Sequence, residues 1–267
     1  MTIKKANLLS GKRILLTRSP SSMEDCAKLF EAEGGTAVSF PVIDFIPADD
    51  FADFDEFFLA RENIDYIVFT SVNSVRYFTE RLSLLKELPD YERINIIAIG
   101  RKTASVCEEA GIRVGYTSPK QNARHLADYF RMLDVKGKTV LYPTSDLAND
   151  YLQNALSLMG AYVKKFVVYR TMKPSEEVIN KYLVNLREGK PDWVVFSSPS
   201  SFQNFISITK EHGINDVLGD NIISIGETTS AEIVKHGFRP LITAEDNSME
   251  GIVKSLVNYY KEKESIE

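Results

Sequence analysis

Residues 65–78 read DYIVFTSVNSVRYF, a stretch that predicts a strand, a short polar loop and the start of a helix. The apolar run from Ile67 to Phe69 is of the β-branched and aromatic kind that lies buried on both faces of a parallel sheet. The run is followed by four polar residues, Thr70, Ser71, Asn73 and Ser74. In open α/β sheets, ligands bind at such junctions, at the carboxyl ends of the strands. We therefore expect this loop to face a ligand.

The same pattern returns at residues 192–205, which read DWVVFSSPSSFQNF. Two further pairs of segments agree: IAIGRKTASVCEEAGI (97–112) with ISIGETTSAEIVKHGF (223–238), and GKRILLTRS (11–19) with GKTVLYPTS (137–145). The offset is 127 from Asp65 to Asp192, and 126 from Ile97 to Ile223 and from Gly11 to Gly137. A repeat of this length is much longer than a solenoid unit. It predicts two similar α/β lobes.

Strands alternate with helices along the chain, which is typical of βαβ units and parallel sheets. The helix after the first polar loop is expected to bury one face, formed by Val75, Phe78 and Leu82. Two segments, residues 38–47 and 163–172, are extended and have no helical period. We expect the crossings between the lobes to lie in these segments, near residues 40–47 and 166–172.

Length and composition indicate a soluble globular protein of two domains. The chain has 267 residues, of which 44% are hydrophobic and 26% are charged. A net charge of -5 and a pI near 5.4 argue against nucleic-acid binding as the main task, but not against an anionic small molecule. No apolar run is long enough to span a membrane, and the first residues lack the apolar core of a signal peptide. A cytoplasmic location is therefore predicted.

Cysteine and histidine usage predicts neither a disulfide nor a metal site. Cys26 and Cys107 stand at non-equivalent places in the two repeats, each on an expected helix, and we interpret both as buried small side chains. His125, His212 and His236 stand apart from one another and from the cysteines, outside metal-ligand spacing.

Signatures of nucleotide binding are missing from the sequence. The GKT at 137–139 is not part of a P-loop, because the position of the leading glycine is occupied by Met132. No expected strand leads into GxGxxG, and FTSVNS lacks the glycine of a flavodoxin phosphate loop. No nucleotide or flavin cofactor is expected.

Hydroxyl-rich loops recur at the expected strand ends, at residues 17–19, 70–74, 103, 144–146, 197–201 and 228–230. Helix capping accounts for any one of them, and Ser200 with Gln203 and Thr229 with Glu232 have capping-box spacing. Six such loops at the carboxyl edges of two sheets favour a cleft lined by backbone N–H donors. Such a cleft suits a ligand with several carboxylates or phosphates.

No Ser-His-Asp or Cys-His arrangement and no carboxylate pair is evident in the sequence. Tyr169 lies in one of the extended segments, where a tyrosine is more often packing than chemistry. If the protein is an enzyme, its catalysis must rest on positioning and electrostatics.

Seven segments taken in order resemble the uroporphyrinogen-III synthase family: LLTRSP near the start, FTSVNSVRYF, IAIGRKTA, VLYPTSDLANDYL, VVYRT, FSSPSSFQNF and IGETTSAE. The resemblance covers the chain from Lys12 to about Leu256. It implies two α/β lobes, each a parallel sheet flanked by helices, joined by a two-stranded connector, with the opening βα unit of each repeat placed in the other lobe. The implied bounds are 1–40 plus 173–267 for the first lobe, 48–165 for the second, and 41–47 and 166–172 for the connector strands.

The resemblance also implies an activity. Such an enzyme needs no cofactor, takes hydroxymethylbilane, removes water from its hydroxymethyl end, and closes the ring with inversion of ring D to give uroporphyrinogen III for tetrapyrrole (haem) synthesis. A monomer and a transient contact with the preceding pathway enzyme are expected. Two alternatives stay open: a non-catalytic two-lobe binding protein for an anionic metabolite, and a nucleotide-dependent enzyme.

The resemblance assigns roles to individual residues. Tyr169 matches the family tyrosine that helps the hydroxyl group depart, and its phenol is expected to donate a hydrogen bond to the leaving oxygen. The expected substrate-binding residues are Thr17, Arg18, Thr70, Ser71, Asn73, Ser74, Thr103, Thr144, Ser145, Ser197, Ser198, Ser200, Thr228 and Thr229. The sequence departs from the usual family pattern at Ser19, in TRSP, and at Ser230, where alanine is common.

Overall fold

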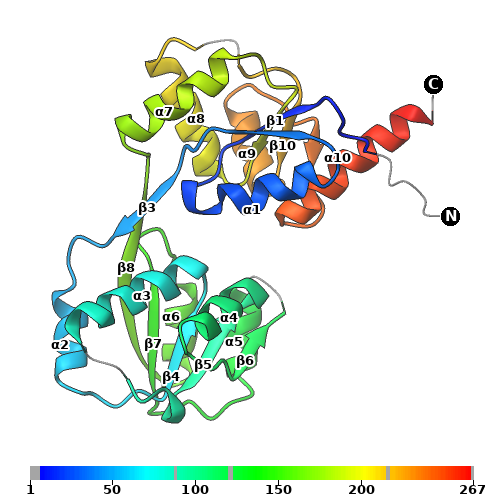
Figure 1. Ribbon diagram of the computed structural model, residues 1–267. Helices are drawn as coiled ribbons and strands as arrows, with labels where there is room; N and C mark the ends of the chain where they lie inside the picture. The colour runs from blue at the N-terminus through cyan, green and yellow to red at the C-terminus, as the bar shows by residue number, and fades with distance from the viewer. Residues whose placement is uncertain (1–6, 87–88, 120–122, 215–216, 266–267) are drawn as a thin grey trace. The chain divides into compact units, whose positions relative to one another are not determined.

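The computed structural model describes residues 7–86, 89–119, 123–214 and 217–265. The chain divides into two compact units (Figure 1). Unit 1 takes the chain up to Asp44 and again from Met172, and unit 2 runs from Phe45 to Thr171. Each unit is built on a parallel sheet flanked by helices, which confirms the predicted α/β class with two lobes.

The sheet of unit 1 has the strand order β11-β10-β9-β1-β2, and all neighbours in it pair in parallel. The strands are β1 (Arg13–Leu16), β2 (Thr36–Ser39), β9 (Trp193–Phe196), β10 (Ile222–Ser224) and β11 (Ile242–Thr243). The helices are α1 (Pro20–Glu31), α7 (Glu176–Arg187), α8 (Pro199–Glu211), α9 (Glu227–Lys235) and α10 (Met249–Glu264). Helices α1 and α10 pack together over one core, which includes Ile14, Leu16 and Trp193. Helix α8 packs on Phe196 through Phe202 and Phe205.

The sheet of unit 2 has the order β3-β8-β7-β4-β5-β6, and the pairs from β8 to β6 are parallel. The strands are β3 (Asp44–Pro47), β4 (Tyr66–Phe69), β5 (Asn95–Ile99), β6 (Tyr116–Ser118), β7 (Thr139–Ser145) and β8 (Tyr162–Met172). The helical segments are α2 (Ala52–Leu59), α3 (Val72–Leu85), the 3-10 turn η1 (Tyr91–Arg93), α4 (Gly100–Glu109), α5 (Ala123–Phe130) and α6 (Tyr151–Leu158). The predicted apolar face of α3 is confirmed, because Val75, Phe78 and Leu82 are all buried.

Each sheet combines strands from distant parts of the chain. In unit 1, β1 lies between β2 and β9, so the first strand of the chain joins the strands of its last third. In unit 2, β7 lies between β8 and β4. Apart from β3, which has no counterpart among the described strands of unit 1, the order β8-β7-β4-β5-β6 in unit 2 corresponds to the order β2-β1-β9-β10-β11 in unit 1. The polar loops after β4, β5 and β7 therefore share one sheet edge, and those after β1, β9 and β10 share the corresponding edge of the other sheet.

An aspartate stands just before one central strand of each sheet, Asp65 before β4 and Asp192 before β9, and each bonds to the start of the neighbouring strand. The Oδ2 atom of Asp65 accepts a hydrogen bond from the backbone N–H of Thr139 at 2.9 Å, and its Oδ1 pairs with Lys138 at 2.9 Å. In unit 1 the Oδ2 atom of Asp192 accepts from the N–H of Arg13 at 2.8 Å. Partial burial acts to raise the pKa of Asp65, but the bonds to Thr139 and Lys138 outweigh it and lower that pKa. Both carboxylates therefore stabilise strand alignment.

Both cysteines are buried, as predicted, Cys26 on α1 and Cys107 on α4. Burial raises the pKa of the Cys107 thiol to about 12, so this side chain acts as an apolar core residue. Within the described residues, no helix has both the length and the apolar content needed to cross a bilayer.

Candidate active site

Tyr169 enters the core of unit 2 through an irregularity in β8. Thr144 on β7 pairs with Val167, whereas the next residue, Ser145, pairs with Tyr169, so β8 has one extra residue at this point. Successive side chains of a regular strand point to opposite faces. The extra residue instead lets Val168 and Tyr169 both contribute to the apolar cluster that also contains Phe166. The bulge thus turns the tyrosine toward α3.

The hydroxyl group of Tyr169 lies beside a serine at the start of a helix. Its oxygen is 3.1 Å from the Oγ atom of Ser71, and either group can be the donor. Only 8% of the tyrosine is exposed. Burial raises the pKa of Tyr169, and hydrogen bonds with Ser71 and Ser145 oppose this only in part. The phenol is therefore neutral at physiological pH and carries a proton that it can donate.

Two aromatic residues contact the ring of Tyr169. Tyr77 on α3 is stacked with it, with the ring centroids 5.6 Å apart and the planes at 17°. Phe45 on β3 meets it edge to face, at 5.7 Å and 83°. The hydroxyl group of Tyr77 donates to the backbone carbonyl of Phe45 at 2.7 Å, which links the two aromatic neighbours.

A carboxylate holds the backbone on both sides of Tyr169. The N–H of Asp146 donates to the carbonyl of Tyr169 at 3.2 Å, and the Oδ1 atom of Asp146 accepts from the N–H of Thr171 at 3.0 Å. These two bonds connect the loop after β7 to the irregular part of β8. Asp146 therefore stabilises the backbone conformation from which Tyr169 projects.

Ser71 also caps α3, and Ser198 caps α8 in the same manner. The Oγ atom of Ser71 accepts from the N–H of Ser74 at 3.0 Å, and the Ser74 hydroxyl donates to the Ser71 carbonyl at 2.7 Å. The corresponding distances between Ser198 and Ser201 are 3.0 and 2.7 Å. Capping is thus a real role of these four serines, as the alternative interpretation of the polar loops predicts.

Two predicted capping boxes were wrong. Helix α8 begins at Pro199, so its N-cap is Ser198 and not Ser200, because proline is favoured at the first helical position. Helix α9 begins at Glu227 after the N-cap Gly226, which places Thr229 inside the helix. Thr103 likewise lies inside α4 and not in a loop.

The remaining predicted site residues differ in exposure. Thr17 is fully buried, and its hydroxyl donates to the carbonyl of Val195 at 2.6 Å, which ties β1 to β9. Arg18 is half-buried, and its Nε donates to the Oγ of Ser22 at 3.3 Å. The other buried side chains are those of Thr103, Thr144 and Thr229. The half-buried ones are Thr70, Asn73, Ser145, Ser197 and Ser200, and Thr228 is exposed.

The predicted residues form one group in each unit. In unit 2 the group lies at the carboxyl ends of β4, β5 and β7 and contains Tyr169. In unit 1 it lies after β1, β9 and β10. Sequence reasoning missed Tyr77, Phe45 and Asp146 as neighbours of Tyr169. The available signals were that Asp146 stands in the predicted polar loop at 144–146, that Phe45 lies in the extended segment 38–47, and that Tyr77 is an aromatic residue outside the predicted apolar face of α3.

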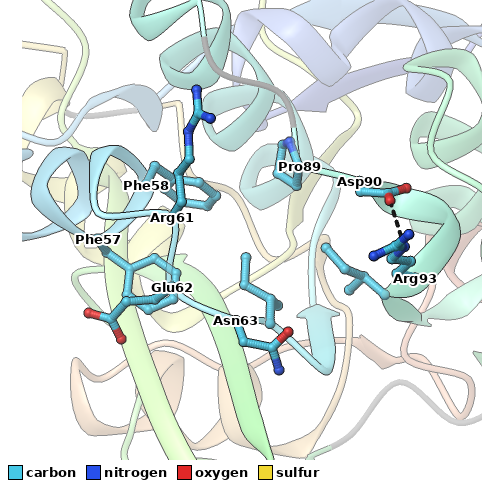
Figure 2. A pocket seen from close by; sticks show the side chains of 10 residues that line it. Phe57, Phe58, Arg61, Glu62, Asn63, Pro89, Asp90 and Arg93 are labelled. Carbon is cyan, nitrogen blue, oxygen red and sulfur yellow. Dashed lines mark ion pairs between the residues drawn. The ribbon is translucent and has the colours of Figure 1, made fainter.

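A separate cavity of about 490 Å³ lies at the opposite edge of the sheet in unit 2 (Figure 2). Its wall includes Phe57, Arg61 and Asn63, which precede β4, and Asp90 and Arg93, which precede β5. The Oδ2 of Asp90 and the Nε of Arg93 form an ion pair at 3.0 Å. None of the predicted site residues lines this cavity.

Fold and site together define a protein of two α/β units in which hydroxyl-bearing residues collect at the carboxyl ends of parallel strands. The family described as "Uroporphyrinogen-III synthase HemD" matches residues 24–254 of the chain. The chain therefore belongs to the uroporphyrinogen-III synthase family.

Individual proteins agree with this assignment. The chain is 24% identical over 259 residues to the uroporphyrinogen-III synthase of Synechococcus elongatus, covering 95% of this chain and 97% of that protein. It is 27% identical over 236 residues to that of Chlorobaculum parvum, covering 88% and 93%. The crystal structure of uroporphyrinogen-III synthetase from Helicobacter pylori matches with a TM-score of 0.60 at 18% identity, covering 93% of this chain and 99% of that one. This last likeness concerns the fold.

Proposed function

We propose that this protein is a uroporphyrinogen-III synthase, which closes hydroxymethylbilane with loss of water and inversion of ring D. The observation that carries the proposal is the family match over residues 24–254. The position of Tyr169 supports it, because a neutral, buried phenol is suited to assist the departure of a hydroxyl group. A non-catalytic binding protein would need no such group.

In the proposed mechanism, Tyr169 donates a hydrogen bond to the hydroxymethyl oxygen as its bond to carbon breaks. The phenol proton passes to this oxygen, which leaves as water, and the positive charge that develops on the carbon is delocalised over the adjoining pyrrole. The resulting phenolate takes back the proton that is released from the attacking pyrrole when the ring closes. Ser71 prepares the phenol, because the Ser71 oxygen accepts from the N–H of Ser74 while its own proton is available for the Tyr169 oxygen. This arrangement leaves the phenol proton for the substrate.

The substrate carboxylates are proposed to bind the polar groups at the carboxyl ends of the strands. Backbone N–H groups in the first turns of α3 and α8 are suitable donors, because helix N-termini favour anions. Partly or fully exposed side chains add donors: Arg18, Thr70, Asn73, Ser145, Ser197, Ser198, Ser200 and Thr228. We assign a different part to Thr17, Ser74, Thr103, Thr144 and Thr229, whose buried side chains shape the loops.

The test is to supply freshly prepared hydroxymethylbilane to the purified protein without any added cofactor, oxidise the products and separate the porphyrin isomers. We expect predominantly the type III isomer. Formation of type I alone, as in spontaneous closure, by folded protein would overturn the proposal and favour a binding protein. The cytoplasmic location, the monomeric state and the contact with the preceding pathway enzyme stay predictions of the sequence.

A further inference from the structure

Tyr77 on α3 lies beside the proposed catalytic tyrosine and is hydrogen-bonded to the backbone. Its hydroxyl donates to the carbonyl of Phe45 at 2.7 Å, and its ring is half-buried. The ring lies nearly parallel to that of Tyr169, at 5.6 Å and 17°. Because the hydroxyl group of Tyr77 is hydrogen-bonded to the backbone, Tyr77 contacts Tyr169 through its ring. We propose that Tyr77 is a positioning residue for Tyr169, an inference that rests on the proposed function.

Tyr169 needs a positioning residue because of the backbone conformation at this point. This residue follows the extra residue of the bulge in β8, where regular strand pairing with β7 is interrupted. Its hydroxyl must nevertheless stay near the Ser71 oxygen, which lies 3.1 Å away. A displacement of about 1 Å at a reacting group can reduce the rate about 10²-fold. Contacts on the ring restrict the side-chain rotation that would move the hydroxyl.

One helix supplies both contacts that fix the phenol. Ser71 is the N-cap of α3 and meets the hydroxyl of Tyr169, whereas Tyr77 lies further along the same helix and meets its ring. Phe45 completes the arrangement from β3, where it contacts the ring of Tyr169 and accepts the hydrogen bond of Tyr77. A site supported by a regular element in this way is more precise than one carried by loops alone.

The proposal separates the two parts of the Tyr77 side chain. Tyr77→Phe keeps the stacked ring but removes the bond to Phe45, and we expect kcat to fall about twofold to threefold. Tyr77→Leu removes the ring, and we expect kcat to fall about tenfold, because the phenol loses its fixed orientation. The KM should stay within about twofold in both variants, because Tyr77 is not assigned to substrate binding.

Tyr116→Leu provides a matched control within unit 2. Tyr116 is also half-buried and is stacked on another tyrosine, Tyr129, at 3.6 Å and 2°. Neither residue belongs to the proposed site. Tyr116→Leu should therefore leave kcat unchanged, and thermal unfolding of all variants shows how much of any effect reflects loss of stability. If Tyr77→Leu does not fold, the comparison rests on Tyr77→Phe.

The decisive measurement is a double-mutant cycle with Tyr169→Phe, read as formation of type III isomer. If Tyr77 acts through the phenol, Tyr77→Leu should lower kcat in the parent protein but by less than about twofold in the Tyr169→Phe background. Equal effects in both backgrounds would overturn the inference. Failure of the proposed function is distinguishable, because the parent protein itself would then form no type III isomer.

A second readout does not depend on turnover. The titration of Tyr169 can be followed by NMR of protein labelled with 13C at the tyrosine rings, with Tyr169→Phe used to assign the signal. Burial is the largest cause of the raised pKa of this phenol. Tyr77→Leu opens one side of the ring and should lower that pKa, whereas Tyr116→Leu should not change it. An unchanged Tyr169 signal in Tyr77→Leu would contradict a positioning role.

Discussion

The N-caps of α3 and α8 have nearly the same geometry but different surroundings. In both, a serine oxygen accepts from an N–H three residues later at 3.0 Å, and the second serine donates back at 2.7 Å. The Ser71 hydroxyl also contacts the phenol of Tyr169, whereas that of Ser198 contacts another serine, Ser200, at 3.0 Å. The same capping motif therefore begins a helix in each unit. In unit 2, the neighbouring strand β8 also places the hydroxyl group of Tyr169 beside this motif.

The residues that face these helices explain the difference. At the predicted repeat offset of 126, the counterpart of Tyr169 is Ile43, which is buried and has no hydroxyl. At the offset of 127, the counterpart of Tyr77 is Asn204, whose Nδ2 donates to the carbonyl of Val42 at 2.9 Å. Tyr77 and Asn204 thus both bond to backbone of residues 42–45, but only Tyr77 has a ring to stack. The comparison predicts that the chemical step depends on residues of unit 2, whereas serine capping stabilises a helix in each unit.

The largest effect is expected from removal of the phenol hydroxyl. Tyr169→Phe should slow formation of the type III isomer about 10²-fold or more, because general acid assistance contributes about 10²–10⁴-fold. The ring and its packing are retained, so the melting temperature should change little. An unchanged rate would exclude Tyr169 from the mechanism. Ile43→Ala, a change at the counterpart in unit 1, should affect stability instead of the chemical step.

Ser71→Ala and Ser198→Ala break the comparison directly. Each removes an N-cap and should lower the free energy of unfolding by about 1 kcal/mol. Ser71→Ala also removes a hydrogen-bond partner of the Tyr169 phenol, so this variant should lower kcat about tenfold, the equivalent of about 1.4 kcal/mol. Ser198→Ala removes a proposed substrate donor and should raise KM while kcat stays nearly unchanged. Denaturant unfolding and isomer analysis of both proteins provide the measurement. Equal losses of kcat would show that the two caps serve the reaction alike.

Substitution of Asp146 should have a smaller effect on kcat, through the backbone that holds the same tyrosine. Asp146→Ala removes the acceptor of the Thr171 N–H and should reduce kcat a few-fold and stability by about 1 kcal/mol, because the bulge in β8 loses one of its ties. Asp146→Asn keeps an oxygen at the same place and is the matched control. If asparagine and alanine reduce the rate equally, the charge of Asp146 matters and not its bond to Thr171.

The sequence predicts the fold better than the site, for physical reasons. Apolar runs such as residues 67–69 and the helical period of Val75, Phe78 and Leu82 record burial directly, and both were confirmed. Helix starts were harder, because several serines near residue 200 offer equivalent caps and Pro199 selects among them. The surroundings of Tyr169 could not be predicted, because a period of two places Val168 and Tyr169 on opposite faces and a one-residue bulge changes this.

The smallest predicted effect concerns pH and is specific to the unit that contains the phenol. Burial raises the pKa of Tyr169 above the reference value of 10.0. A group whose pKa is higher in the folded state contributes stability that is fully present below the pKa of the unfolded state and is lost as the pH rises through the folded value. Stability should therefore fall above about pH 10, where the unfolded chain releases this proton first. Denaturant unfolding from pH 8 to 11 should show a shallower alkaline decline in Tyr169→Phe than in the parent protein. Identical slopes would show that the phenol titrates alike in both states, which is incompatible with the enclosed ring between Tyr77 and Phe45.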